Sequence, residues 1–359
     1  DIHAPYQHPD TIAFLAEVAD MIDPDLVVNL GDECFPGDVE IMTEVGWVPF
    51  REYSEDVKVL AVSDGGAAGY EYPIRKVQKS GSFEILEREH TLIRQRTTPK
   101  HNLVKVDPRT GAWHRREAWD TKGTHSWYIP RNCVAAEDTE WNLSDAELRL
   151  LVAFQADGTF TKGAVRFAFT KQRKAERLVE LLTALQIPYS THSVERGDLQ
   201  YYIRVEDVPA YLSKTFSDVL PVSGGALRQR KVFLDELVHW DGTPVLGGVR
   251  YTSTSKENLD FVQAVAVTSG KYAKCTYPYV DVRERTENTS LKTAKESRST
   301  VSDVYCVTVS TGMILIRDAG HVSVVGNCDM HAMSFHDSDP NLDSAGAELE
   351  RSKIFLEQL

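Results

Sequence analysis

The chain has 359 residues, of which 42% are hydrophobic and 26% are charged, and its formal net charge is −13 at pH 7. These proportions are ordinary for soluble globular proteins, and the length is sufficient for two or three domains with their own hydrophobic cores. No run of eighteen apolar residues occurs, which excludes a membrane-spanning helix, so we expect no membrane partner. We also expect a monomer.

The negative charge lies at the two ends of the chain. Residues 1–33 contain eight acidic and no basic side chains, and residues 328–359 contain seven acidic and two basic ones. Residues 141–300 sum to +3, which is compatible with nucleic-acid binding and equally with an ordinary solvated surface. The five cysteines are widely scattered without metal-finger spacing. This favours reactive thiols in a reducing compartment, and we expect a cytoplasmic protein.

Residues 1–33 predict a short α/β fragment that carries metal ligands. A helix with apolar residues at helical spacing precedes a buried strand, which ends in a Gly-Asp turn at Asp32. Carboxylates at strand ends lie where open α/β sheets bind ligands, and the Asp-x-His formed by Asp1 and His3 adds further donors. Such a set suits a site for two divalent metal ions, and an acidic loop surface explains the same residues.

Removal of residues 34–327 joins the flanks into the phrase Leu-Val-Val-Asn-Leu-Gly-Asp-Glu-Cys-Asp-Met, a continuous strand and turn. The joined Gly-Asp-x-x-Asp and the Asp-x-His resemble motifs of the calcineurin-like metallophosphoesterases. This implies divalent metal ions bound by Asp1, His3 and Asp32 in the complete host. Only the 65 residues of the two flanks are present, without the later Asn-His and His-x-His ligands of that family. We therefore interpret residues 34–327 as a removable insert and the two flanks as parts of a truncated host protein.

Residues 34–140 predict an all-β segment. Alternating strands separated by Gly-rich turns follow one another, and no amphipathic run of helical length occurs before residue 143. Within this segment stands Thr98-Pro-Lys-His101, and histidine is the side chain best suited to proton transfer near neutral pH. A lone histidine in a β-domain is usually structural. Whether His101 is catalytic is therefore judged from the residues at the two ends of the segment.

Both ends of residues 34–327 carry reactive side chains. The segment opens on Cys34, whose thiol is a strong nucleophile, and closes on Asn327, which is followed by Cys328. The side-chain amide of an asparagine can attack its own carbonyl and form a succinimide, which breaks the chain on its C-terminal side. A single Asn-Cys pair is usually inert, but here it stands at one border of a block whose other border is also a cysteine.

These motifs, in this order and at both borders, resemble the sequence blocks of inteins. Cys34 resembles their first block, and Thr98-Pro-Lys-His101 resembles their Thr-x-x-His block. Residues 304–315 resemble the penultimate block, and the Val-Gly-Asn-Cys phrase that ends at Cys328 resembles the terminal one. The resemblance implies the all-β, horseshoe-shaped Hint fold and autocatalytic protein splicing.

The implied splicing reaction starts at the first border. Cys34 attacks the carbonyl of Glu33 and replaces the amide by a thioester. His101 donates a proton to the departing nitrogen, and Thr98 positions or polarises that bond. The fold contributes the orientation of groups that already belong to one molecule, and the resemblance implies no cofactor for splicing.

The implied reaction ends at the second border. Cys328 takes the acyl chain from Cys34, Asn327 cyclises and releases the insert, and an S-to-N shift leaves a peptide bond between Glu33 and Cys328. The substrate is therefore the chain's own pair of flanks, the exteins, in a single-turnover reaction.

Three positions depart from the intein pattern. Gly326 stands where many inteins have a histidine before the terminal asparagine, and Cys306 and Met313 stand where the penultimate block often has an aspartate and a histidine. The usual proton donors for cyclisation are therefore missing, and His321 or a water molecule is the expected substitute. Cys306 is either a small buried hydrophobe or a group that tunes the reactive thiols. We hypothesise that oxidation joins it to Cys34 in a disulfide that blocks splicing.

Residues 141–300 predict an α+β domain with an internal repeat. A capping box opens an apolar helix that ends at Asp157, and strands, a helix and another strand follow. A second capped, apolar helix ends at Ser269, about 112 residues later. The first helix resembles the LAGLIDADG helix of homing endonucleases, whose C-terminal carboxylate binds a divalent metal. The resemblance implies pseudo-symmetric αββα repeats, with Mg²⁺ as the cofactor of any cleavage.

In this pairing of helices, Ser269 occupies the place of the second acid. Serine is a poor metal ligand, so we expect impaired, nicking or absent cleavage of DNA. We expect binding of double-stranded DNA to persist on a saddle of strands, and ordinary solvated charges are the alternative. The candidate contacts are Lys171, Arg173, Arg204, Arg228, Arg230 and Lys231.

The sequence therefore predicts a multidomain chain. Residues 1–33 and 328–359 form short α/β exteins, residues 34–140 with 301–327 form the Hint domain, and residues 141–300 form the endonuclease domain. Two alternatives stay open: a metallophosphoesterase that carries an inert insertion, and a DNA-binding protein that no longer splices. A denaturing gel of freshly expressed chain separates all three.

Overall fold

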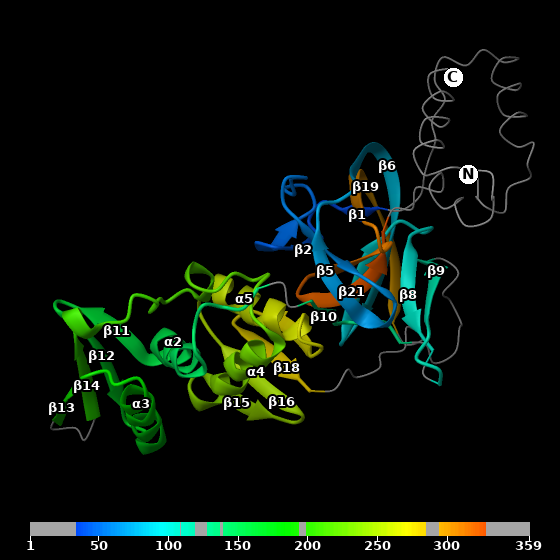
Figure 1. The fold of residues 1–359 in the computed structure, drawn as a ribbon. Coiled ribbons are helices and arrows are strands. Elements are labelled where there is room, and N and C mark those ends of the chain that lie inside the picture. The colour runs from blue at the N-terminus through cyan, green and yellow to red at the C-terminus, as the bar shows by residue number, and fades with distance from the viewer. Residues whose placement is uncertain are drawn as a thin grey trace, which may run out of the picture.

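The computed structural model of the chain is elongated and has two parts (Figure 1). The β part contains the described strands of residues 34–136 and 294–327, and the α/β part contains residues 139–284. The structure describes residues 34–107, 109–118, 128–136, 139–193, 199–284 and 294–327. The expectations for Asp1, His3, Asp32 and Cys328 lie outside the described residues. None of the helices in these ranges combines the length and the apolar character needed to cross a membrane.

Two sheets form the β part. One has the strand order β1-β19-β6-β7, and the other has the order β10-β5-β4-β2-β20-β21-β8-β9, with β3 paired to β2. The strands before the α/β part are β1 Phe35–Pro36, β2 Glu40–Thr43, β3 Gly46–Pro49, β4 Val59–Val62, β5 Ala67–Glu71, β6 Arg75–His90, β7 Ile93–Thr97, β8 Asn102–Val106, β9 Trp113–Glu117 and β10 Val134–Ala135. Those after it are β19 Lys295–Thr308, β20 Met313–Asp318 and β21 His321–Gly326. No α-helix occurs among the described residues of 34–136, which confirms the all-β prediction.

The predicted boundary between residues 300 and 301 falls inside β19. This strand runs antiparallel to β6 from Lys295 onward, with one irregularity between Val301 and Asp303. The β part therefore resumes at or before Lys295. The first half of β19 is exposed or half-buried on both faces. It consequently lacks the apolar alternation from which a strand is recognised in a sequence.

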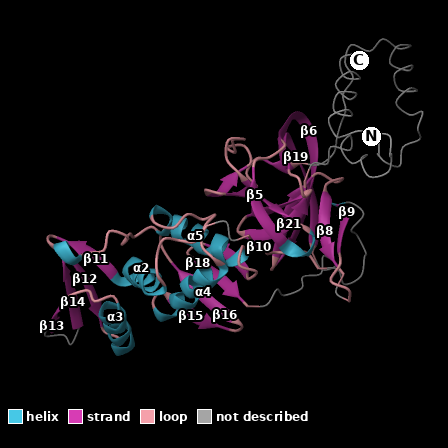
Figure 2. Cartoon of the chain, viewed as in Figure 1, coloured by secondary structure: helices cyan, strands magenta, loops and turns pink. Residues whose placement is uncertain are grey.

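The α/β part contains the same α-β-β-α-β-β order of elements twice (Figure 2). The first unit consists of α2 Asp145–Asp157, β11 Gly158–Thr161, β12 Ala164–Phe169, α3 Gln172–Ala184, β13 Ser190–Ser193 and β14 Leu199–Arg204. The second consists of α4 Leu227–Glu236, β15 Gly242–Val245, β16 Gly248–Thr252, α5 Lys256–Val267, β17 Tyr272–Thr276 and β18 Tyr279–Arg283. Their sheets have matching orders, β11-β12-β14-β13 and β15-β16-β18-β17. Three 3-10 helices complete this part: Val205–Asp207, Phe216–Asp218 and Leu237–His239.

The order of elements makes α4, and not α5, the counterpart of α2. Each of α2 and α4 precedes the first strand of its unit, whereas α5 follows the second strand, as α3 does. The predicted pairing of Asp157 with Ser269 is therefore wrong. Nine of the twelve residues of α5 are buried, so its apolar sequence reflects burial on several sides. The shorter α4 is rich in charged residues, so its sequence lacks the apolar run that predicts a buried helix.

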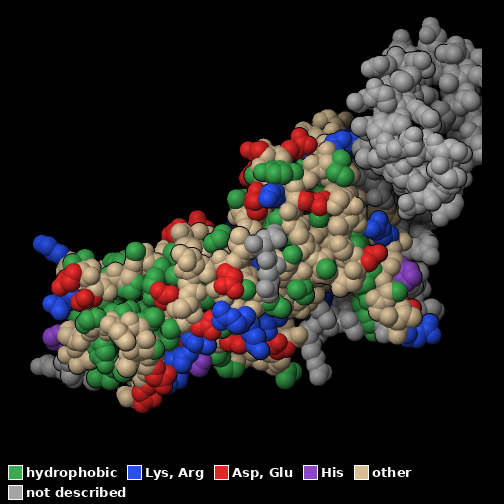
Figure 3. Space-filling view, in the orientation of Figure 1, with side chains coloured by type: hydrophobic (Ala, Val, Ile, Leu, Met, Phe, Trp, Pro, Cys, Tyr) green, Lys and Arg blue, Asp and Glu red, His purple; other side chains and the backbone are tan. Residues whose placement is uncertain are grey.

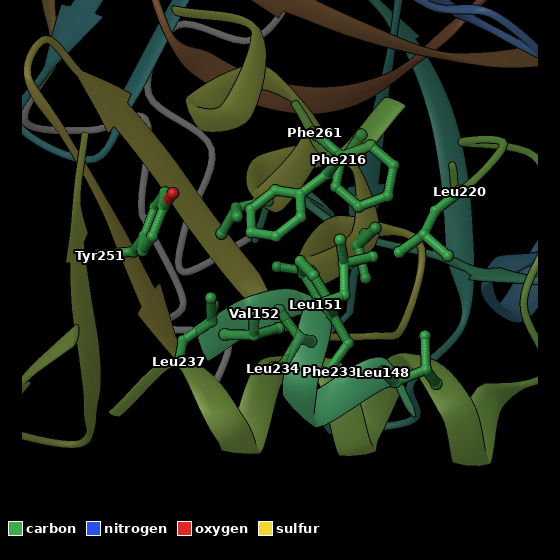
Figure 4. Close-up of a cluster of buried hydrophobic side chains, with 14 of the residues drawn as sticks. Leu148, Leu151, Val152, Phe216, Leu220, Phe233, Leu234, Leu237, Tyr251 and Phe261 are labelled. Atoms are coloured by element: carbon green, nitrogen blue, oxygen red, sulfur yellow. The ribbon is translucent and has the colours of Figure 1, made fainter. Parts of the chain in front are cut away.

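The helices α2 and α4 pack against each other in the centre of the α/β part (Figure 4). Leu151 and Val152 of α2 lie among aromatic side chains from several elements. The ring of Phe233 on α4 lies 4.8 Å from that of Phe216 and 5.5 Å from that of Phe261 on α5. Because burial of one such side chain contributes about 1.5–3 kcal/mol, this cluster fixes the helix pair.

A buried arginine connects the two parts. Arg317 on β20 bonds to Glu40 on β2 and, at 2.5 Å and 3.1 Å, to Asp260 and Gln263 on α5. Its guanidinium also lies 4.9 Å from the ring centroid of Trp47. The side chain is only 3% exposed, so these acceptors replace water almost completely. The second unit of the α/β part is thereby joined to the strands of the β part.

We expect Arg317→Met to destabilise the folded protein by about 3 kcal/mol, because Glu40 and Asp260 would face each other without their shared cation. The loss should appear as a lower urea midpoint of unfolding. The matched control is Arg298→Met, whose ion pair with Glu84 is exposed and should matter little. Equal midpoints for the two variants would contradict a structural role of the buried arginine.

Candidate active sites

The first candidate site surrounds Cys34 at the start of the β part. The Cys34 backbone N–H donates to Oγ1 of Thr98 at 3.1 Å, and the Thr98 N–H donates to the Cys34 carbonyl at 3.0 Å. The backbone N–H of His101 in turn donates to the Thr98 carbonyl at 3.1 Å, which closes the tight turn between β7 and β8. The His101 ring meets the Phe35 ring edge-on, with 4.3 Å between centroids. The nitrogen of the Glu33–Cys34 peptide bond is therefore hydrogen-bonded to the Thr98 hydroxyl.

The second border reaches the same place through β21. Val325 pairs with Leu103 of β8 in an antiparallel register, and continuation of that register sets Asn327 opposite His101. Asn327 is 1% exposed. Its backbone N–H donates to the Gly312 carbonyl at 3.0 Å, and its Nδ2 donates to the Val309 carbonyl at 3.1 Å. Cys34 and Asn327 are almost three hundred positions apart in the sequence, and both lie near the start of β8.

Cys306 lies at the same site. Strand β1 pairs with β19 so that Phe35 is opposite Tyr305, and one further step sets Cys34 opposite Cys306. Both side chains are buried, and both are thiols in this structure. Directly opposed residues on antiparallel strands have Cβ atoms about 5 Å apart, close to the separation that a disulfide bridges. The predicted partnership of these two thiols is therefore geometrically accessible.

The predicted role of His321 conflicts with its position. It stands at the far end of β21, paired with Asp318, so about 20 Å of strand separates it from Asn327. Burial and the nearby Lys274 lower the pKa of its imidazole. A histidine at position 326 is also excluded, because a Cβ on Gly326 would lie 2.7 Å from the Cβ of Asn102. Close packing of β21 on β8 therefore requires glycine at this position.

The second candidate site lies where the two units of the α/β part meet. Asp157 ends α2, and Asp241 holds the corresponding place before β15, each followed by Gly-Thr. Nζ of Lys174 lies 2.5 Å from Asp157 and 3.9 Å from Asp241. Burial and the charge of Asp157 raise the pKa of the Asp241 carboxyl, while Lys174 and Lys214 oppose the shift. The negative charges of Asp157 and Asp241 are therefore close enough to interact.

An open cavity of about 1120 Å³ is lined by Asp241 and by Gln155 and Ala156, the two residues before Asp157 on α2. Lys171, Arg173, Lys174 and Lys214 line it together with Asp241. Nζ of Lys214 also donates to the last carbonyls of α2, those of Phe154 and Gln155, at 2.9 and 2.7 Å. A cavity lined by four basic side chains and by Asp241 suits a polyanion whose backbone is to be cut beside a metal ion.

Three of the basic residues proposed to bind DNA lie elsewhere than expected. Arg230 is 1% exposed and bonds to the carbonyls of Gly224 and Thr268, so its role is structural and its prediction is wrong. Arg228 and Lys231 are exposed on α4 rather than on a sheet. Lys and Arg side chains do gather over the α/β part on the face shown in Figure 3.

Arg204 is exposed at the end of β14, where it forms ion pairs with Glu206 and Asp207. Lys171 caps the start of α3, Arg173 lies in its first turn, and both line the cavity. Ser269 lies beyond α5 and bridges to Val134 of β10, so it anchors the α/β part to the β part. Sequence reasoning missed Asp241, although the repeated Asp-Gly-Thr phrase was available as a signal.

The two carboxylates fit a hard divalent cation. Asp157 and Asp241 offer oxygen donors from two units to one place, which is the donor type that Mg²⁺ prefers. No group of three or more His, Cys, Asp or Glu residues suited to a metal ion occurs within the described ranges. A cation at this site would therefore complete its coordination with water or with phosphate oxygens of a substrate.

No family model matches the chain. The curated ribonucleoside-diphosphate reductase subunit beta of Aquifex aeolicus (strain VF5) is 25% identical over 355 aligned residues, covering 84% of this chain and 51% of the relative. The chain thus spans about half the length of that relative.

A solved structure of the AceL NrdHF class 3 split intein, a GSH-linked and splice-inactive variant, overlaps at 9% identity and a TM-score of 0.36, covering 82% of this chain and 99% of that one. The N-terminal LAGLIDADG domain of DUF199/WhiA overlaps at 14% identity and a TM-score of 0.30, covering 42% and 80%. None of these three is named a phosphoesterase, so the predicted identity of the flanks gains no support.

Proposed function

We propose that residues 34–327 excise themselves from the chain by protein splicing and join Glu33 to Cys328. The observation that carries this proposal is the convergence of Cys34, His101 and Asn327 at the start of β8. A nucleophile at one border, an asparagine at the other and an imidazole between them are the groups that two successive exchanges of peptide bonds require.

The first exchange begins with Cys34. Its thiol attacks the carbonyl of Glu33, the carbon–nitrogen bond breaks, and a thioester forms as the thiol proton passes through His101 to the departing nitrogen. That nitrogen is the one whose N–H donates to Thr98, so the hydroxyl fixes the orientation of the bond that breaks. His101 is buried beside Phe35 and supplies the proton. The thioester is then passed to the thiol of Cys328, and cyclisation of Asn327 releases the insert.

The test is a denaturing gel with mass spectrometry on freshly expressed chain. Splicing gives a fragment of residues 34–327 and a joined product of residues 1–33 and 328–359. A stable full-length band with phosphatase activity would instead support a metallophosphoesterase with an inert insertion. A stable band that binds DNA would support an element that no longer splices.

Splicing should respond to thiol oxidation. We expect oxidised glutathione to convert Cys34 and Cys306 into a disulfide, with loss of two protons and two electrons, and to arrest splicing because the nucleophile is consumed. Dithiothreitol should restore the reaction. A Cys306→Ser chain should show the same rate with and without the oxidant. Oxidant-resistant splicing of the unaltered chain would contradict the cross-strand arrangement.

We further propose that the α/β part binds double-stranded DNA and cleaves it at the cavity beside Asp157 and Asp241. The observation that favours this function is that one carboxylate from each unit lies close to Lys174, which lines a cavity with three further basic side chains. Asp157 and Asp241 would hold Mg²⁺, which when bound supplies charge stabilisation for hydrolysis of a phosphodiester. Lys171 and Arg173 would bind backbone phosphates. The earlier expectation of impaired cleavage depended on Ser269 and loses its basis.

A further inference from the structure

Cyclisation of Asn327 needs a proton carrier that its neighbour does not supply. Nδ2 of the asparagine must lose a proton as it attacks, and the nitrogen of the next residue must gain one as it leaves. Position 326 is closed to any side chain by Asn102. Met313, which pairs with Gly326, carries no ionisable group, and His321 lies at the opposite end of the strand.

The register of β8 and β21 brings His101 into this position. Directly opposed residues of an antiparallel pair project to the same face, with Cβ atoms about 5 Å apart. Extension of this register by one residue past the contact of Gly326 with Asn102, beyond the ends of both strands, sets Asn327 opposite His101. Both are buried, at 1% and 0% exposure. An imidazole in this place therefore reaches the asparagine amide more readily than bulk water does.

The loop between β19 and β20 orients the asparagine for attack. The Val309 and Gly312 carbonyls accept hydrogen bonds from its side chain and its backbone. Its Oδ1 is buried and has no hydrogen-bond partner among the described residues. The side chain is therefore held by its nitrogen, which is the atom that must be deprotonated.

The same imidazole lies at the first border. Its ring contacts Phe35, and its backbone is tied through Thr98 to Cys34. One histidine thus lies between the peptide bond that breaks first and the peptide bond that breaks last. The two borders share it because β1 contacts β7, the turn from β7 to β8 carries His101, and β21 pairs with β8.

We propose that His101 catalyses both bond exchanges in turn, which rests on the splicing function proposed above. In the first step it accepts the thiol proton of Cys34, donates it to the departing nitrogen of the same residue and is left neutral. In the last step the neutral imidazole accepts the proton of Asn327 Nδ2 while the bond from Nδ2 to the asparagine carbonyl carbon forms. The bond to the nitrogen of Cys328 then breaks, and that nitrogen receives the proton from the imidazolium. No co-reactant is consumed.

The test isolates the last step by replacing Cys34 with alanine, which removes the thioester route. At pH 8 the Cys34→Ala chain should still break after Asn327 and release residues 328–359. Adding His101→Gln should slow this release by about 10²-fold or more, and should remove its rise with pH through the range where histidine titrates. The matched control, His321→Gln in the same background, should release the segment at an unchanged rate. Retained far-ultraviolet circular dichroism would show that each variant is folded.

Equal release rates with and without His101 would overturn the shared role, while splicing of the unaltered chain would stand. Absence of release from the Cys34→Ala chain would also overturn it, because a neutral imidazole should serve Asn327 without the first step. An unaltered chain that never splices or breaks at either border would instead overturn the proposed function itself.

Discussion

Replacement of both Cys34 and Asn327 by alanine should leave the chain intact at 359 residues, whereas the unaltered chain should disappear into an excised fragment and a joined product. The effect should be complete, because alanine offers neither a nucleophile at the first border nor a side-chain amide at the second. Time-resolved denaturing gels with mass spectrometry measure the outcome. Asn327→Ala alone should stop at a thioester-linked form, from which added thiol releases the segment that ends at Glu33.

The matched control for this experiment is Cys275→Ala. This thiol lies on β17 in the α/β part, away from both borders, and burial raises its pKa to about 11, so it is a weak nucleophile near neutral pH. The Cys275→Ala chain should splice as the unaltered chain does. Excision by the double variant, or arrest by the control, would show that the reactive groups have been misassigned.

Asp241→Asn should abolish Mg²⁺-dependent DNA cleavage, with a loss of about 10²-fold or more, because one of the two carboxylates proposed to hold the metal ion would lose its charge. Binding of DNA without Mg²⁺ should persist, since the basic side chains of the cavity are unchanged. A suitable substrate is duplex DNA that encodes residues 1–33 joined to 328–359, the sequence an inserted element interrupts. Cleavage is read as linear product on an agarose gel, and binding as a mobility shift.

Ser269→Ala discriminates between the two pairings of the repeat. If α5 were the counterpart of α2, Ser269 would stand at the second metal position, and its substitution would change cleavage. The topology assigns it to an anchoring bridge with Val134, so Ser269→Ala should cleave DNA as the unaltered chain does. Full cleavage by Asp241→Asn together with a loss in Ser269→Ala would contradict the structural pairing.

The sequence determined the chemistry of the proposed splicing site. Cys34, His101 and Asn327 are recognisable because their reactivity belongs to their side chains and their order along the chain is fixed. The all-β character of the segment after Cys34 was equally readable, because half-buried strands alternate apolar and polar residues. The start of β19 was not, since that stretch buries neither face.

Only the tertiary structure decided which groups meet. Ser269 follows an apolar helix and Asp241 follows a charged one, and apolar character reports burial rather than position within a repeat. Strand order resolved the difference, because the two sheets have matching topologies with α4 in the place of α2. Likewise, the missing histidine at Gly326 is explained by the approach of β21 to Asn102. Contacts between segments that are distant in sequence depend on register and packing, which no single stretch of residues encodes.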